Sequence, residues 1–405
     1  MPVVNAINHG GEHDVLAAAK EDHESVIELT RDLVAIPSRG GVDSYDPVLN
    51  RLSIWLEQRH LAATVLKDKT GATVGLTCEV KGARPGPRWV LDACLDTAPF
   101  GDEHAWTHPP TSAVIDDGWL YGRGSADSKP AAAIFCHIAA RLATTPSTLR
   151  GSLVLLFDVD EHTGGFGGAK RYFEGLDAPD DVVGVMIGYP GMDKLVIGGR
   201  GVHRAKLHVH GVASHSGGSK TTPSAIEKAA NLIRVLSTAE LPDGTSPEFP
   251  LPGKLTATAI QGGEGYSVTP DLCTVNVDIR TTPTFNDEAA SHLLEHLVAG
   301  VDDAWPGTRP TLIQVDTCWP AYALDEKSRL RTALLDAAKT TGVHVEAKIA
   351  GPSNIGNYLA GLGIPATAGF GVTYTGLHGT DERARLDTIP TVQATYHKAV
   401  LQLMA

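Results

Sequence analysis

The stretch RWVLDACLDTAPFGDEHAWTHPPTSAVIDDGWLYGRGSADSKPAAA, residues 88–133, decides the fold class of this chain. It begins with a largely apolar run that is typical of a strand buried on both faces of a sheet. A helical pattern follows over residues 128–143, with Pro130 in the first turn, where its missing N–H costs little. A buried strand that ends near Asp96 and is followed by a helix indicates an α/β unit.

Neighbouring segments repeat this arrangement. Apolar, strand-like runs recur at residues 151–159 and 181–188, and a helical pattern lies between them. An amphipathic helix is predicted over residues 13–35. Strands that alternate with helices predict a mainly parallel mixed sheet, here assigned to a catalytic domain of residues 1–198 and 312–405.

The pattern changes after about residue 198. Residues 204–212, 254–263 and 271–282 alternate apolar and polar side chains, as half-exposed antiparallel strands do. Helices are predicted from Thr222, as the N-cap, and over residues 286–301. Residues 199–311 are therefore predicted to form an inserted α+β domain.

Composition excludes several classes of protein. The chain has 405 residues and a formal net charge of −13, which argues against a nucleic-acid surface. Its five cysteines are scattered and do not suggest a disulfide framework. No run approaches the roughly 18 apolar residues of a membrane span, and residues 1–15 lack the features of a signal peptide. We expect a cytoplasmic protein without a nucleic-acid or membrane partner.

Acids and imidazoles gather where the predicted strands end. Asp96 follows one strand, Glu161 and His162 follow the next, and Asp127 and His378 lie in glycine-containing loops. In open α/β sheets ligands bind at the carboxyl ends of strands. Any one of these residues alone is more often structural, for example as a helix cap, but several segments that share one edge favour an active site.

The order of these segments resembles the metallopeptidase and deacylase family that includes acetylornithine deacetylase, succinyl-diaminopimelate desuccinylase, aminoacylase and the glutamate carboxypeptidases. CLDTAP is similar to the family's H-x-D-T-V-P, GRGSADSKP to G-R-G-x-x-D-x-K-G, and DEHTGGFGG to D-E-E-x-G-G-x-G-G. GVASHSG, VDIRTTP and HGTDE match its later segments. The resemblance covers nearly the whole chain and implies a zinc-exopeptidase-like catalytic domain with an inserted dimerisation, or lid, domain.

The family holds two zinc ions bridged by one aspartate, and the resemblance implies a ligand set for each ion. Its first site corresponds to Cys94, Asp127 and Tyr189, and its second to Asp127, His162 and His378. Two histidines and a carboxylate are an ordinary catalytic zinc set. A tyrosine with a reference pKa of about 10 is a poor ligand, and a thiolate needs a positive neighbour. We expect one tight divalent ion, zinc or alternatively Mn or Co, at the second site, and an empty or weak first site.

Purely structural roles are alternatives to these assignments. Cys94 is better explained as a small buried hydrophobe, and Tyr189 as a packing or substrate-binding residue. His162 has the alternative of a neutral imidazole that fills the place of a lost glutamate. The trio of two histidines and one carboxylate nevertheless favours ligation by His162.

The remaining site residues are implied by the resemblance. Glu161 matches the general base, and Asp96 matches an aspartate that orients a ligand. His215 matches a histidine that stabilises the oxyanion from a partner subunit. Arg280 matches an arginine that binds a substrate carboxylate, and Ser267 replaces an asparagine that holds the substrate carbonyl.

The sequence thus predicts a homodimeric metallo-amidohydrolase that acts on an N-acyl amino acid or a small peptide-like molecule, with Glu161 as base. Two alternatives stay open. One is a family relative recruited to acyl transfer, cyclisation or lyase chemistry, and the other is a non-catalytic binding protein.

Overall fold

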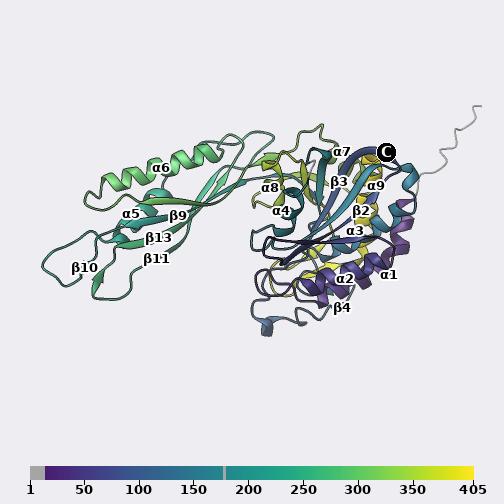
Figure 1. The fold of residues 1–405 in the computed structure, drawn as a ribbon, viewed down its shortest axis with the longest axis horizontal. Coiled ribbons are helices and arrows are strands. Elements are labelled where there is room, and N and C mark those ends of the chain that lie inside the picture. The colour runs from purple at the N-terminus through teal and green to yellow at the C-terminus, as the bar shows by residue number, and fades with distance from the viewer. Residues whose placement is uncertain (1–13, 177–178) are drawn as a thin grey trace, which may run out of the picture. The chain divides into compact units, whose positions relative to one another are not determined.

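The computed structural model describes residues 14–176 and 179–405 of the chain (Figure 1). Residues 1–13 lie outside the described part, so the expectation that the chain lacks a signal peptide rests there on sequence alone. Among the described residues, no helix is both long and apolar enough to cross a membrane.

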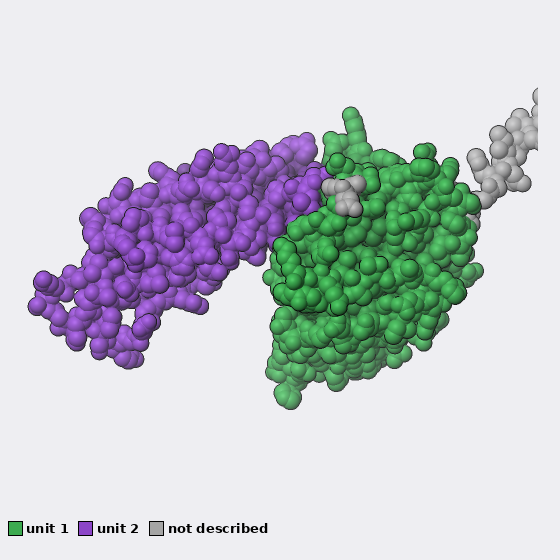
Figure 2. Space-filling model, viewed as in Figure 1, with its two compact units in different colours: residues 1–196, 325–347, 364–405 green, residues 197–324, 348–363 purple. Residues whose placement is uncertain are grey.

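The chain forms two compact units (Figure 2). Unit 1 comprises residues 1–196, 325–347 and 364–405, and unit 2 comprises residues 197–324 and 348–363. The expected boundary near residue 198 lies two residues from the observed one. The catalytic domain was expected to resume at residue 312, but unit 1 resumes at residue 325. The reason is that β14 (Leu312–Trp319) pairs with β9 (Gly201–His210) and so belongs to unit 2.

The central sheet has the strand order β1-β2-β6-β3-β7-β17-β8-β15, and β16 also pairs with β8. The short strand β15 (Tyr322–Ala323) pairs with Gly198 and Gly199 of β8. The neighbours β6, β3, β7 and β17 run parallel, whereas β1, β2 and β8 are antiparallel to the strands beside them. This arrangement confirms the mainly parallel mixed sheet. The strands are β1 (Ala63–Lys67), β2 (Thr73–Lys81), β3 (Arg84–Cys94), β6 (Arg150–Asp158), β7 (Val182–Ile187), β8 (Lys194–Gly199), β16 (Glu346–Ala350) and β17 (Ala366–Gly369).

Helices of unit 1 pack on this sheet and on one another. The predicted helix over 128–143 is α3 (Lys129–Ala143), which is apolar and buried almost all round because it contacts β3 and β6 as well as α1 and α9. Asp14 caps α1 by accepting hydrogen bonds from the N–H groups of Leu16 and Ala17. The other helices are α1 (Val15–Ala35), α2 (Asp46–Glu57), α4 (Gly167–Phe173), α7 (Arg329–Thr340) and α9 (Ile389–Leu403), with single 3-10 turns at Glu103–Ala105, Pro146–Thr148, Pro179–Asp181 and Leu386–Thr388.

A second, small sheet of unit 1 has the order β18-β19-β5-β4. It is formed by β4 (Ile115–Asp116), β5 (Trp119–Tyr121), β18 (Tyr374–Thr375) and β19 (Arg383–Arg385). Tyr121 pairs with Arg383, so the segment after β5 and the segment before β19 lie together although they are far apart in the sequence.

Unit 2 is an antiparallel sheet of order β11-β13-β9-β14, with α5 and α6 packed on it. Alternate side chains of β9 and β13 are buried against these helices, as the period-two pattern predicts. The predicted N-cap Thr222 is wrong: Ser224 accepts the hydrogen bond from Glu227 N–H, while the Thr222 hydroxyl bonds the Val212 carbonyl. Further elements are β10 (Ser214–His215), α5 (Ala225–Ser237), β11 (Lys254–Gly262), β12 (Val268–Thr269), β13 (Leu272–Thr281), α6 (Asp287–Asp303), β15 (Tyr322–Ala323) and α8 (Ile355–Gly361).

Candidate active site

The carboxyl ends of three parallel strands carry the first group of candidate residues. Cys94 ends β3 and pairs with Asp158 at the end of β6, and β7 runs parallel to β3 on its other side. Glu161 and His162 follow β6, and Tyr189 follows β7. Because parallel strands end at the same edge, these segments meet where the sequence predicted a site.

The small sheet of unit 1 supplies the second group. Asp127 lies in the loop after β5, and His378 lies in the connection between β18 and β19. The pairing of β5 with β19 brings the two loops together, and Nε2 of His378 lies 2.9 Å from Oδ2 of Asp127. Two segments about 250 residues apart in the sequence are thereby joined at one point.

His162 connects the two groups. Its Nε2 lies 3.7 Å from Oδ2 of Asp127, and its Nδ1 lies 3.3 Å from Oδ2 of Asp96. The side chain is 7% exposed, and neither ring nitrogen makes a hydrogen bond to any described residue. Burial alone would lower the pKa of His162, but the carboxylates of Asp127 and Asp96 outweigh it and raise that pKa to about 10. In the metal-free chain this imidazole thus carries a proton that a cation at the same place would replace.

Asp96 supports His162. Its two carboxylate oxygens accept hydrogen bonds of 3.0 Å each from the backbone N–H groups of Glu161 and His162. The carboxylate is fully buried and faces the Nδ1 side of the His162 ring. A carboxylate behind an imidazole fixes the ring orientation and makes the opposite nitrogen a better ligand.

The donor atoms of Asp127, His162 and His378 all lie within 4.8 Å of one another, so this trio fits a divalent cation. Two imidazoles and one carboxylate are the set that catalytic zinc sites use while a further position stays open. The buried Nε2 of His162 without a hydrogen-bond partner points to the same use. Burial would raise the pKa of Asp127, but the nearby imidazoles of His162 and His378 hold it well below its usual range, which keeps the carboxylate charged.

Cys94 is a poorer candidate ligand. Its Sγ lies 3.3 Å from the Ser128 hydroxyl and 3.9 Å from Oδ1 of Asp127. Burial and the carboxylates of Asp127, Glu161 and Asp96 raise the pKa of this thiol well above its usual value. A second grouping of Cys94, Asp96 and His162 also lies within 4.8 Å, but both oxygens of Asp96 already accept backbone hydrogen bonds.

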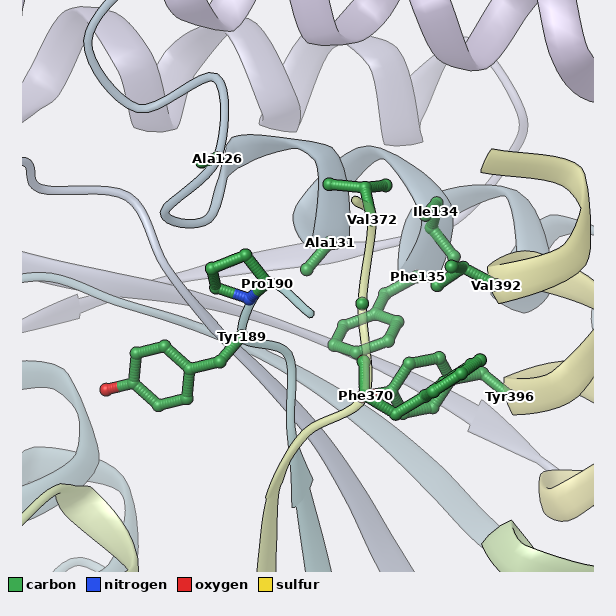
Figure 3. A pocket seen from close by; sticks show the side chains of 11 residues that line it. Ala126, Ala131, Ile134, Phe135, Tyr189, Pro190, Phe370, Val372, Val392 and Tyr396 are labelled. Carbon is green, nitrogen blue, oxygen red and sulfur yellow. The ribbon is translucent and has the colours of Figure 1, made fainter. Parts of the chain in front are cut away.

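Tyr189 contacts the expected base. Its hydroxyl donates a short hydrogen bond to Oε1 of Glu161. Burial and the nearby Glu161 raise the pKa of Tyr189 well above its usual value, so the phenol keeps its proton and donates it. The backbone around Tyr189 borders a small apolar cavity of about 10 Å³ lined by Phe135, Phe370 and Tyr396 among others, and the Tyr189 hydroxyl points away from that cavity (Figure 3).

The sequence interpretation missed the buried ion pair of Arg123 and Glu382. The two side chains are 2% and 1% exposed, and their charged atoms lie 2.5 Å apart. Glu382 also accepts hydrogen bonds from the N–H groups of Gly124, Ala126 and Asp127, and Arg123 donates to the carbonyl of His378. The pair therefore holds the two loops that carry Asp127 and His378. The sequence contained a clue to this pair, because Arg123 and Glu382 lie inside the motifs GRGSAD and HGTDE.

The other predicted residues lie in unit 2. His215 is in β10, opposite Val268 of β12, and the N–H of Ser216 donates to the carbonyl of Ser267. His215 and Ser267 are therefore neighbours and both exposed. Arg280, near the end of β13, forms an ion pair of 2.7 Å with Asp278 and donates to Ser353.

A cluster of imidazole and carboxylate groups at the strand ends of an α/β sheet is typical of a metallohydrolase. Residues 90–402 match the description "Peptidase family M20/M25/M40", and the chain belongs to this family. The predicted family and enzyme class, a metallohydrolase of the peptidase and deacylase type, are confirmed.

Individual relatives agree with this membership. A succinyl-diaminopimelate desuccinylase of Marinobacter nauticus is 28% identical over 330 residues, which are 79% of this chain and 84% of that protein. Aminopeptidase PepT of Bacillus cereus superposes with a TM-score of 0.74 at 16% identity, over 94% of this chain and 98% of that one. The Bacillus subtilis YXEP protein, a dinuclear metal-binding peptidase of the M20 family, gives 0.71 at 18% identity over 95% and 99%. At such identities the structural likeness shows the fold alone.

Proposed function

We propose that this chain hydrolyses the amide bond of an N-acyl amino acid or small peptide-like molecule, using one divalent ion per active site. The observation that carries the proposal is the convergence of Asp127, His162 and His378 within 4.8 Å, directly beside Glu161. Zinc suits two imidazoles and a carboxylate best among the divalent ions considered. When bound, such an ion would supply Lewis acidity toward a carbonyl oxygen and a water molecule.

Glu161 is the proposed proton shuttle. Oε1 accepts from Tyr189, so Oε2, 3.6 Å from Nδ1 of His162, is the oxygen free to take a proton from the attacking water. Burial and the Asp127 charge raise the pKa of Glu161, which makes the carboxylate a stronger base than an exposed glutamate. The same oxygen then returns the proton to the leaving nitrogen. Asp96 holds His162 in place during these steps, and Tyr189 holds Glu161.

Substrate recognition is assigned to unit 2. Arg280 would pair with a substrate carboxylate, and Ser267 would contact the substrate carbonyl. His215 would stabilise the oxyanion in the active site of a partner subunit, which makes the protein a homodimer. We assign the protein to the cytoplasm.

Product analysis in isotopically labelled water tests the reaction class. N-acetyl and N-succinyl amino acids and dipeptides would be incubated with the purified chain, with and without a chelator. Hydrolysis places the label in the released carboxylate, and the chelator abolishes release. Transfer of the acyl group to another acceptor without label in any carboxylate would instead assign the protein to acyl transfer, for which the replaced ligands Cys94 and Tyr189 are the motivating observation. Binding of these molecules without turnover would assign it to a non-catalytic role.

A further inference from the structure

A separate cluster of potential metal ligands lies in unit 2. His203 is in β9, Cys318 is in β14, and the two residues are directly paired across the strands. Directly paired side chains lie on the same face of a sheet, with Cβ atoms about 5 Å apart. Asp287, the first residue of α6, completes the cluster because α6 packs against β9 and β14. One donor atom of each residue lies within 4.8 Å of the other two.

The burial and hydrogen bonding of the cluster leave a ring nitrogen of His203 able to bind a ligand. Nδ1 of His203 lies 2.5 Å from Oδ1 of Asp287, and the Cys318 thiol also hydrogen-bonds this carboxylate. The His203 side chain is 1% exposed, and its Nε2 has no hydrogen-bond partner among the described residues. The ring can therefore change tautomer without breaking another hydrogen bond, which frees the lone pair of Nδ1. Asp287 is about half exposed and Cys318 is at least partly exposed, so solvent reaches two of the three residues.

We propose that His203, Asp287 and Cys318 bind one divalent thiophilic cation of the zinc type, in addition to the ion of the active site. Nitrogen, oxygen and sulfur donors in one cluster are a set that zinc accepts, with solvent in the fourth position. Ligand bonds of about 2.0–2.3 Å require the His203 and Asp287 atoms to separate by roughly 1 Å, which rotation of the half-exposed Asp287 side chain allows. Burial and the Asp287 carboxylate raise the pKa of the Cys318 thiol to about 12, so this thiol loses its proton to solvent only as the metal–sulfur bond forms. The bound ion would join β9, β14 and α6.

Cobalt titration of the full-length, metal-stripped chain tests this proposal, because a cobalt–thiolate bond gives a charge-transfer absorption in the near ultraviolet. We expect the wild type to show this band, Cys318→Ser to lose it and Cys94→Ser to keep it. The comparison separates the two thiols that lie in donor clusters of the described residues. A wild type without the band, a band that persists in Cys318→Ser, or one that disappears in Cys94→Ser would overturn the proposal.

Substitutions at the start of α6 give an independent test with little risk to folding. Asp287→Asn keeps the size of the side chain but weakens the ligand, so the cobalt affinity measured from this band should fall by about 10-fold or more. Glu288→Gln is the matched control, because Glu288 is the exposed acid next along the helix and should leave the affinity unchanged. Equal affinities for wild type and Asp287→Asn, or an equal loss in Glu288→Gln, would contradict ligation by Asp287. Circular dichroism verifies that each variant is folded.

Discussion

Tyr189 donates its hydroxyl hydrogen bond to Oε1 of Glu161. The family resemblance implies a metal ligand at the position of Tyr189, whereas here the side chain contacts Glu161, the proposed base. The hydrogen bond leaves one oxygen of Glu161 for proton transfer and opposes the effect of burial on its pKa. If Glu161 is the base, as proposed, Tyr189 acts on the chemistry through this hydrogen bond.

Replacing Glu161 by glutamine should therefore remove turnover and keep the metal. The amide retains the shape of the side chain but cannot accept the proton, so kcat should fall by about 10²-fold or more. Tyr189→Phe is the companion variant: it removes only the hydrogen bond to Glu161, so kcat/KM near neutral pH should fall by roughly 10-fold. Steady-state kinetics and elemental analysis measure both effects. A fully active Glu161→Gln chain would show that another residue is the base. A metal-free Glu161→Gln chain would show that Glu161 is a metal ligand.

The buried pair of Arg123 and Glu382 should dominate the stability of the loops that carry Asp127 and His378. Glu382→Gln leaves the Arg123 charge buried without its partner, which costs about 3–5 kcal/mol in the free energy of unfolding. Asp387→Asn is the matched control, because it breaks an exposed ion pair with Arg385 and should cost less than about 1 kcal/mol. Urea unfolding compares the two variants. Similar small losses in both would show that the ion pair does not hold the loops.

His137 predicts a pH dependence of stability that is independent of the active site. This buried side chain contacts Ser25 and the Ala133 carbonyl, and burial lowers the pKa of His137 to about 4. Between about pH 4 and pH 6.5 the unfolded chain therefore binds more protons than the folded chain, so stability falls as the pH falls through this window. The loss attributable to His137 should reach about 3 kcal/mol.

The His137→Gln variant isolates this contribution, because glutamine has no proton to gain in that range. Urea unfolding at several pH values should show a steeper loss for the wild type than for the variant between about pH 6.5 and 4. Parallel curves for the two chains would mean that His137 does not titrate as a buried neutral group.

Mixed dimers test the assignment of His215 to the partner subunit. Inactive Glu161→Gln chains and inactive His215→Ala chains would be combined under conditions that allow subunit exchange. In each mixed dimer one site would have an intact Glu161 and an intact His215 from the other chain, so activity should return to about one site of two. If exchange is verified by native mass spectrometry and no activity returns, His215 does not act across the dimer.

Local patterns in the sequence were sufficient to predict much of the architecture. The apolar run before Asp96 and the alternating residues of β13 predicted a mixed sheet and an antiparallel insert, because burial on two faces or one leaves different periodicities. The start of α5 was mispredicted because both Thr222 and Ser224 can cap a helix, and tertiary hydrogen bonds decide between them. The point at which the catalytic domain resumes was placed at residue 312, which is too early, because β14 pairs with a strand about 100 residues earlier in the sequence. No local pattern reveals such a pairing.

The residues of the candidate site could be predicted from sequence motifs. The contacts that these residues make with one another depend on tertiary packing and could not be predicted. Asp127, His162 and His378 could be selected from their motifs, and the structure places them together. The target of Asp96 could not be predicted, because its contact with His162 depends on how the loop after β6 folds back. Glu382 lies in a recognised motif, but only the structure shows that it accepts three backbone hydrogen bonds from the Asp127 loop.

The central claim is that Asp127, His162 and His378 hold one tightly bound divalent ion. Elemental analysis of Cys318→Ser chains tests it most directly, because the proposed cluster of unit 2 then contributes no ion. We predict about one ion per chain in that background, its loss on adding His162→Ala, and its retention on adding Cys94→Ala. Two tightly bound ions per Cys318→Ser chain, or an ion that remains after His162→Ala, would contradict the account.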